Sequence, residues 1–246
     1  MNRFNVERFS QFNGAEMIAK KWGFTRQSLD AFGLESHQRA IAATDAGAFD
    51  AEIVPIEMPQ SDGTMKLHTH DEGIRYDASL ESMASLDSLA PGGIITAGTS
   101  SQICDGASAA LIVSEKALKE HGLVPSARIV NLTVTAGDPV IMLEEPLYAT
   151  ERALKRAGMS LDDIDLFEVN EAFASVPMAW LKYHNADPEK LNVNGGAIAL
   201  GHPLGATGTK LMATLINALK ARNKRYGLQT MCEGGGMANV TIIERL

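Results

Sequence analysis

The second part of this chain alternates short apolar runs with longer amphipathic ones, and this alternation is what most constrains its fold. Four runs have the length and residue types of strands: 127–136, 165–169, 228–231 and 238–246. Three runs between them have the apolar spacing of helices: 145–158, 171–184 and 206–225. Strands that alternate with helices predict an α/β fold in which a layered sheet carries helices on its faces.

The first part of the chain has a different texture. Thr25 is placed to cap a helix over 26–47, and an extended stretch follows at 51–59. Residues 60–93 are polar and rich in turn formers, which favours an irregular loop outside the core. The apolar run 93–98 predicts a short buried strand, and Asp105 is placed to cap a helix over 106–122.

Composition excludes several classes of protein. With 246 residues, of which 45% are hydrophobic, the chain is long enough to bury a sizeable core without disulfides. A formal net charge of −8 argues against a broad basic face for nucleic acid. Two cysteines are too few for a disulfide scaffold, which favours a reducing, cytoplasmic setting. We expect no membrane association, because no apolar run approaches the ~18 residues of a bilayer span and the first residues lack a signal-peptide core.

Three polar side chains follow predicted strands or lie in glycine-rich segments, where α/β sheets commonly bind ligands. They are Asn170, His202 and Cys232, the last followed by three glycines from Gly234 onward. A thiol can give or take a proton, an imidazole can activate a thiol, and an amide can orient a water. Glycines beside the thiol let a backbone N–H approach a substrate oxygen. The set therefore suggests thiol acid/base chemistry.

Each of these residues also has a simpler interpretation when it is taken singly. A lone cysteine is usually a small buried apolar residue, and glycine clusters usually mark turns. The run LHTHDE at 67–72 offers two histidines and two carboxylates, but nothing downstream completes a metal-ligand set, so a polar loop is favoured. Neither GATGTK nor NGGAIALG has the spacing of a phosphate or dinucleotide loop.

The exact residues of three motifs are more informative than the spacing of single side chains. NEAFA at 170–174, NGGAIALGHPLGATG at 194–208 and CEGGGMA at 232–238 together resemble the C-terminal half of thiolases, the acetyl-CoA acetyltransferases and 3-ketoacyl-CoA thiolases. The stretch AGTSS at 97–101, followed by DGA at 105–107, also matches the family. The resemblance covers essentially the whole chain and implies a thiolase-like layered α/β/α core, its C-terminal half complete, with a partial helical and irregular loop domain.

The resemblance implies roles for the candidate residues in a CoA-dependent exchange. His202 is similar to the histidine that activates the nucleophilic cysteine and helps to bind the thioester oxygen. Cys232 resembles the second cysteine, which acts as acid and base on the acyl acceptor. Asn170 resembles the asparagine that holds a water in the first oxyanion hole, and Gly234 the glycine whose N–H contributes to the second.

Further positions resemble those that contact coenzyme A or the acyl group. Arg75, Ser82 and Ser101 resemble residues that contact the CoA molecule. Met142, Ala172 and Phe173 resemble residues that line the pocket near the pantetheine and acyl ends. For Arg75 the alternative is a solvated surface charge, and the two interpretations have equal weight. The family implies no metal and no organic cofactor, because coenzyme A is a substrate.

The resemblance implies a division of the chain into three parts. Residues 1–92 would form a partial loop domain that binds CoA, 93–125 the end of the N-terminal core domain, and 126–246 the C-terminal core domain. The family's acylated cysteine has no counterpart here, and Cys104 matches a position that is not nucleophilic, so we interpret it as structural. The run LEEP at 143–146 departs from the glycines of many relatives and leaves acyl-chain specificity open.

Three hypotheses about function remain at this point. The first is that the chain is a truncated form of a thiolase of fatty acid metabolism. The second is that it is one subunit of a split thiolase whose partner chain supplies the N-terminal half. The third is that it is a non-catalytic lobe that binds CoA or another protein. A half of a ketoacyl synthase is disfavoured by Cys232 with its glycines. Since thiolase core halves pack together, we expect exposed apolar surface, and therefore homo-oligomers, a partner chain or aggregation.

Overall fold

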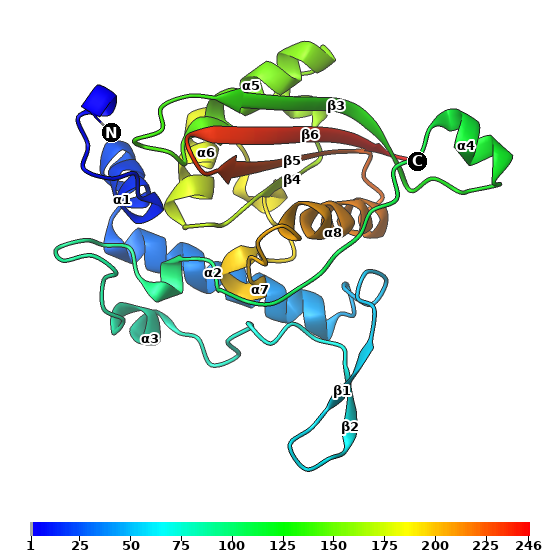
Figure 1. Ribbon diagram of the computed structural model, residues 1–246, viewed down its shortest axis with the longest axis horizontal. Coiled ribbons are helices and arrows are strands. Elements are labelled where there is room, and N and C mark those ends of the chain that lie inside the picture. Colours follow the sequence, from blue (N-terminus) through cyan, green and yellow to red (C-terminus); the bar gives the residue numbers. More distant parts are fainter. Residues whose placement is uncertain (1) are drawn as a thin grey trace.

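The computed structural model describes residues 2–246, and a four-stranded sheet forms the centre of its second half (Figure 1). The strands are β3 (Ala127–Ala136), β4 (Leu166–Val169), β5 (Tyr226–Glu233) and β6 (Met237–Arg245), in the spatial order β3-β6-β5-β4. Strand β6 pairs antiparallel with β3 and β5, whereas β4 pairs parallel with β5. Because the last pair is parallel, the carboxyl ends of β4 and β5 meet at one edge.

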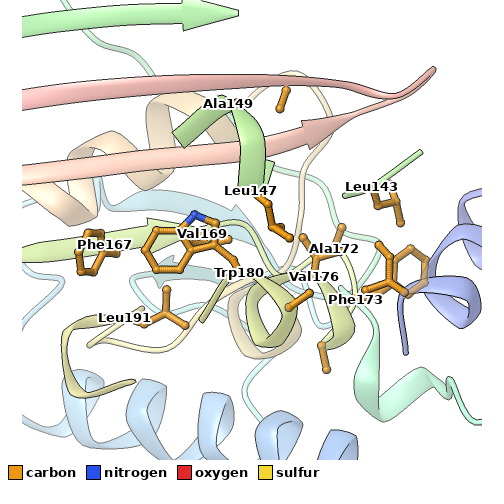
Figure 2. Packing of buried hydrophobic residues seen from close by; sticks show 14 of the residues in the cluster. Leu143, Leu147, Ala149, Phe167, Val169, Ala172, Phe173, Val176, Trp180 and Leu191 are labelled. Atoms are coloured by element: carbon orange, nitrogen blue, oxygen red, sulfur yellow. The ribbon is translucent and has the colours of Figure 1, made fainter. Parts of the chain in front are cut away.

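Helices cover both faces of this sheet, as the alternation of the sequence predicts. Helices α5 (Glu145–Ala157) and α6 (Ser175–His184) lie on one face and α8 (Thr207–Ala221) on the other. Successive residues of β4 point to opposite faces: Phe167 packs against Trp180 of α6, while Leu166 packs against Leu215 of α8. Figure 2 shows Phe167 and Trp180 side by side within the larger core. The layered α/β architecture expected from the sequence is confirmed.

Two long helices dominate the first part of the chain. Helix α1 (Gln11–Trp22) precedes α2 (Arg26–Asp45), which begins with a capping box at Thr25, as the sequence predicts. A two-stranded hairpin of β1 (Ile56–Pro59) and β2 (Met65–His68) projects from the body, and α3 (Leu80–Ala84) follows. Short elements complete the chain: α4 (Glu115–Glu120), α7 (Ala197–Leu200), η1 (Asn2–Phe4), η2 (Ala97–Thr99), η3 (Leu161–Asp163) and η4 (Pro188–Lys190).

The predicted helix over 106–122 is wrong for most of its length. Residues 101–114 have no regular structure, and helix α4 begins only after its N-cap Ser114. The segment instead lies along the loop before α8, where a side chain on Gly106 would collide with Pro203 and the Ser108 hydroxyl donates to the Ala206 carbonyl. These contacts over long sequence distances outweigh the local capping signal at Asp105.

Two other boundaries differ from the sequence prediction. Residues 93–98 are not a strand, because the Glu16 carboxylate accepts hydrogen bonds from the N–H groups of Ile94 and Ile95 in place of a neighbouring strand. The helix expected from residue 171 begins at Ser175 as α6, since residues 172–174 pair with 99–101 instead: Ser101 N–H donates to the Ala172 carbonyl and Ala174 N–H to the Thr99 carbonyl. Within residues 2–246, no helix is long and apolar enough to cross a membrane.

Candidate active site

Asn170 lies directly beyond the last residue of β4 and is held there by the sheet. Its backbone N–H donates to the Thr230 carbonyl of β5 at 3.0 Å, so the pairing of the two strands extends through it. The side chain is buried, and its Nδ2 lies 3.4 Å from Nε2 of His202. Asn170 Oδ1 is buried without a hydrogen-bond partner among the described residues. The structure therefore brings two of the predicted catalytic side chains into direct contact.

The hydrogen bonds around His202 define which ring nitrogen carries the proton. Nδ1 lies 2.6 Å from the Thr207 hydroxyl, and that hydroxyl donates its single proton to the Pro203 carbonyl at 2.9 Å. With its proton directed to the Pro203 carbonyl, the Thr207 hydroxyl accepts from Nδ1–H; this tautomer leaves Nε2 without a proton, facing Nδ2 of Asn170, which can donate to it. Burial, and then the charge of Lys210, lower the His202 pKa below its usual value. The ring is thus neutral at pH 7 and presents Nε2 as a proton acceptor.

Cys232 lies near the end of β5, two residues beyond the partner of Asn170. The thiol is half-buried and packs against the main core, and burial raises its pKa to about 12. Such a thiol keeps its proton at neutral pH, which suits an acid better than a free nucleophile. Within residues 2–246 no hydrogen bond joins Cys232 to Asn170 or His202, so their common role stays a prediction.

The glycines after Cys232 form the turn between β5 and β6. A side chain on Gly236 (φ 82°) would meet the Asp138 carbonyl oxygen at 2.7 Å, and the Gly236 carbonyl accepts from Gly137 N–H at 2.8 Å. Gly234 is exposed instead, and a Cβ there would meet nothing within 4 Å. The turn is anchored at Gly236, while the Gly234 backbone remains open to a ligand.

The three residues predicted to line the acyl and pantetheine ends all belong to the main core. Met142, Ala172 and Phe173 are buried in the same large cluster against which the Cys232 side chain packs. Ser101 joins them through its N–H, which donates to the Ala172 carbonyl at 3.0 Å. Met142 has a φ of 60°, a left-handed conformation that is uncommon outside glycine. That these residues form the wall of an acyl pocket stays a prediction.

Arg75 and Ser82 lie in the irregular part of the chain, and both are exposed. The Arg75 N–H donates to Nδ1 of His37, so its backbone is fixed while its guanidinium is free to face a solvent-borne ligand. The Ser82 hydroxyl donates to the Ser79 carbonyl in the capping box of α3. No hydrogen bond ties either residue to Asn170 or His202 within the described chain, so their role in CoA binding stays a prediction.

Two buried carboxylates near the site were given no role by the sequence reasoning. Glu144 accepts from Lys21 Nζ at 2.7 Å and from Trp22 Nε1 at 2.8 Å, which fastens α1 to the start of α5. The unusual LEEP run therefore carries a contact within the core. Glu171, next to Asn170, is buried as well and accepts three hydrogen bonds. Its only sequence signal was its position inside the NEAFA motif.

The remaining thiol lies beside the segment that carries His202, whose N–H donates to the Gln102 carbonyl at 3.0 Å. Cys104 is exposed, and its sulfur lies where a side chain on Gly201 would be. No group of three or more His, Cys, Asp or Glu side chains within residues 2–246 is arranged to hold a metal ion.

Two family models match the chain in succession. The thiolase N-terminal domain matches residues 11–116, and the thiolase C-terminal domain matches residues 123–245. The predicted three-part division at 92 and 125 is not tested by these boundaries and stays a prediction.

Individual relatives agree with the family models. A steroid 3-ketoacyl-CoA thiolase of Mycobacterium tuberculosis is 54% identical over all 246 residues, which make up 59% of its own length. A 3-ketoacyl-CoA thiolase of Psychrobacter cryohalolentis is 49% identical over 94% of this chain and 60% of its own. The chain thus spans about three fifths of the length of the curated relatives it matches.

Solved structures show the same likeness. The acetyl-CoA acetyltransferase of Bacillus anthracis superposes with a TM-score of 0.91 at 36% identity, covering 98% of this chain and 61% of that one. Human mitochondrial 3-ketoacyl-CoA thiolase superposes with a TM-score of 0.89 at 41% identity, covering 95% and 59% of the respective chains. The likeness extends over nearly all of this chain in both cases.

Proposed function

Because this chain belongs to the thiolase family, we propose that it binds a CoA thioester where β4 and β5 end. The reaction we propose is thiolytic cleavage of a 3-ketoacyl-CoA, or the reverse Claisen condensation of two acyl-CoA molecules. The observation that carries this proposal is the direct contact of Asn170 with His202 at 3.4 Å, with Nε2 of the neutral ring unprotonated.

In this proposal the His202 ring first accepts a proton and then donates it. Unprotonated Nε2 takes the proton of an attacking thiol, which converts that thiol to the thiolate needed for attack on a carbonyl. The ring then carries N–H at both nitrogens, and the Asn170 amide, 3.4 Å from Nε2, holds a water beside it in this proposal. Nε2–H and that water both donate to the thioester oxygen, which stabilises the negative charge that develops there.

The proposed role of Cys232 is proton transfer at the carbon next to the thioester carbonyl. In the cleavage direction its S–H gives a proton to that carbon as the carbon–carbon bond breaks. In the condensation direction the thiolate takes the proton back and leaves an enolate. A pKa raised to about 12 supports a thiol that returns readily to its protonated form. The open backbone N–H at Gly234 is the proposed donor to the second thioester oxygen.

Substrate binding in the proposal uses two separate regions. Met142, Ala172 and Phe173, with Ser101 beside them, form the apolar wall next to the reacting carbonyl. The exposed Arg75 guanidinium and Ser82 lie along the rest of the CoA molecule, where a cation can face phosphate groups or adenine. We propose coenzyme A as substrate and assign no metal or organic cofactor, and the two unpaired thiols are consistent with a reducing cytoplasm.

We also propose that this chain alone does not turn over by thiolysis. The acyl-enzyme route requires an acylated thiol in addition to Cys232, and the only other thiol of the 246 residues is the exposed Cys104. The nucleophile would then come from residues outside this sequence, either in the same polypeptide or in a partner chain. Thiolysis of acetoacetyl-CoA by the purified chain, surviving Cys232→Ala, would contradict this.

A second candidate is a lobe that binds CoA or another polypeptide without catalysis. The exposed apolar side chains of Ile103, Leu111 and Ile112 favour contact with further protein, because they lie together in the segment 101–114, which has no regular structure. The same observation supports a homo-oligomer. A monodisperse monomer in light scattering would argue against both forms of association.

Deuterium exchange into acetyl-CoA distinguishes the enzymatic proposal from the binding lobe. Removal and return of a methyl proton needs a base and an oxyanion hole but no acylated thiol, so this chain should carry it out in D₂O. We expect exchange above the buffer rate, abolished in Cys232→Ala and His202→Ala and retained in the control Cys104→Ala. Binding of acetyl-CoA without exchange would overturn the catalytic proposal and support the lobe.

A further inference from the structure

The Glu171 carboxylate joins three segments that are far apart in the sequence. Oε2 accepts from the Ser36 hydroxyl of α2 at 2.7 Å and from the Ile198 N–H of α7 at 3.1 Å. Oε1 accepts from Nδ2 of Asn192 at 2.8 Å. The side chain is only 1% exposed, so all of its strong interactions are with protein groups. A buried carboxylate that accepts three hydrogen bonds is held in one place.

Asn192 connects this carboxylate to the end of β4. Its Oδ1 accepts from the Val169 N–H and its Nδ2 donates to the Val169 carbonyl, both at 2.9 Å. The second hydrogen of the same amide goes to Glu171. Asn192 itself has a φ of 44°, so its backbone is bent to bring the side chain into this position. The Asn192 amide is thereby fixed in a single orientation.

Two glycines bring the chain close to the same point. A Cβ on Gly196 would lie 2.2–2.5 Å from the Glu171 carboxyl atoms, and the Gly196 N–H donates to the Ser36 hydroxyl at 3.1 Å. A Cβ on Gly195 (φ 82°) would meet the Ser36 carbonyl oxygen at 2.6 Å. The segment that leads to α7 therefore lies directly against Glu171 and α2, with no room for a side chain between them.

Resting on the proposed function of Asn170 and His202, we propose that Glu171 is a positioning residue that sets the contact between these two side chains. It is bonded covalently to Asn170 on one side. On the other it holds the N–H of Ile198 in α7, a helix that ends at Leu200, two residues before His202. The carboxylate thus spans the two segments whose ends carry the reacting amide and imidazole.

Glutamine at position 171 cannot reproduce these contacts in either orientation of its amide. With its oxygen toward Ile198 N–H, its NH₂ group faces the NH₂ of Asn192, which cannot turn without losing both bonds to Val169. With its NH₂ toward Ile198, two donors oppose each other, because a backbone N–H cannot accept. Either way at least one bond is lost: the first orientation breaks the bond to Asn192 at the end of β4, and the second breaks the bond to Ile198 N–H and releases the segment before His202.

Glu168 provides a matched control for this substitution. It lies on β4, three residues before Glu171, and is equally buried, yet neither carboxyl oxygen has a hydrogen-bond partner among the described residues. Glu168→Gln therefore makes the same chemical change without breaking a bond. The test compares wild type, Glu171→Gln and Glu168→Gln of the 246-residue chain by ¹⁵N NMR of the His202 ring, without ligand, over a pH series.

The ¹⁵N chemical shifts and the titration midpoint of the His202 ring distinguish a positioning role of Glu171 from a merely structural one. We expect Glu171→Gln to move the Nδ1 and Nε2 resonances and to raise the titration midpoint toward the ordinary histidine value, because release of the segment admits water to a ring now shielded beside Lys210. Glu168→Gln should leave both unchanged. Ser36→Ala removes one donor to Glu171 and the acceptor of Gly196 N–H but keeps the bonds from Ile198 and Asn192. It should give a smaller change in the same direction and serves if Glu171→Gln does not fold.

Two results would overturn the proposal. One is a His202 signature in Glu171→Gln that matches wild type even where stability falls, which would make Glu171 structural only. The other is a change of the His202 resonances in Glu168→Gln as large as that in Glu171→Gln, which would show that any change in the buried carboxylates of this region has the same effect. Neither readout uses a CoA thioester, so failure of acetyl-CoA to bind would count against the proposed function and leave this test intact.

Discussion

Gly196→Ala offers a stringent test of the packing around Glu171. The backbone of Gly196 (φ −139°, ψ −161°) is extended and suits any residue, so the substitution introduces no backbone strain. The added methyl, however, would lie 2.2 Å from the carboxyl carbon of Glu171 and 2.4 and 2.5 Å from its two oxygens. Real methyl groups do not approach other atoms so closely, and the carboxylate, held by three donors, must move.

The expected loss of stability follows from two contributions. Overpacking a tight core costs about 1–3 kcal/mol. Displacing the carboxylate also breaks at least one hydrogen bond to a charged group, which contributes about 1.5–3 kcal/mol. We therefore expect Gly196→Ala to lower the free energy of unfolding by about 3 kcal/mol, or Tm by about 6–12 °C for a chain of this length.

Urea and thermal unfolding of Gly196→Ala beside Gly208→Ala measure this effect. Gly208 lies inside α8, where an added methyl would find its nearest neighbour, the Met231 terminal methyl, at 3.7 Å. That control should be neutral or gain up to about 1 kcal/mol, because alanine favours a helix over glycine. A Gly196→Ala protein whose unfolding free energy lies within about 0.5 kcal/mol of wild type would refute the described packing of Glu171.

Three further substitutions test other parts of the structure. Burial and the charge of Arg75 lower the His37 pKa from 6.5 to about 4, so the neutral form of His37 stabilises the fold above pH 6.5. Relative to His37→Asn, wild type should therefore lose about 3 kcal/mol of unfolding free energy as pH falls from 6.5 to 4. If urea titrations gave the same pH dependence for both proteins, this would be contradicted. Burial raises the Glu168 pKa well above 4.5, so wild type loses stability as pH rises above 4.5 and Glu168→Gln should gain stability relative to it. A difference that stays constant with pH in urea titrations would refute the assignment. Thr150→Val removes the acceptor of the buried Trp180 Nε1–H at 2.9 Å and should cost about 1–3 kcal/mol in denaturant unfolding, whereas an unchanged midpoint would show that the bond contributes nothing.

The second half of the fold could be predicted from local sequence signals. Strand β3 spans 127–136 as expected, and α5 ends at Gly158, whose φ of 67° is the left-handed conformation that glycine supplies at a helix end. In these segments the periodicity of the side chains and the turn residues point to the same structure. Local and tertiary preferences agree there, which is why the boundaries were predictable.

Prediction failed where long-range contacts determine the backbone. The run around 106–114 carries a capping Asp105 and apolar residues, yet it lies along the loop before α8 and forms no helix. Residues 93–98 have the composition of a buried strand, but the Glu16 carboxylate occupies the place of a strand neighbour. Neither partner is visible in the local sequence, so propensity alone gives the wrong element.

The candidate site was predictable in part for the same reason. The rule that polar residues gather at strand ends places Asn170 near the end of β5, and the structure adds its contact with His202. The role of Glu171 could not be predicted, because its partners Ser36 and Asn192 lie 135 and 21 residues away. A carboxylate inside a motif gives no indication of which distant donors will meet it.

The proposed function requires that Asn170, His202 and Cys232 share one pocket for a thioester. Titration of the 246-residue chain with acetyl-CoA, followed by NMR of the Asn170 side-chain amide, the His202 ring nitrogens and the Cys232 Cβ, tests this directly. We predict that all three signals shift together and give a single dissociation constant, while the ring of the exposed His121, in the turn after α4, stays unchanged. Shifts at one group alone, or different dissociation constants for the three, would contradict a common pocket.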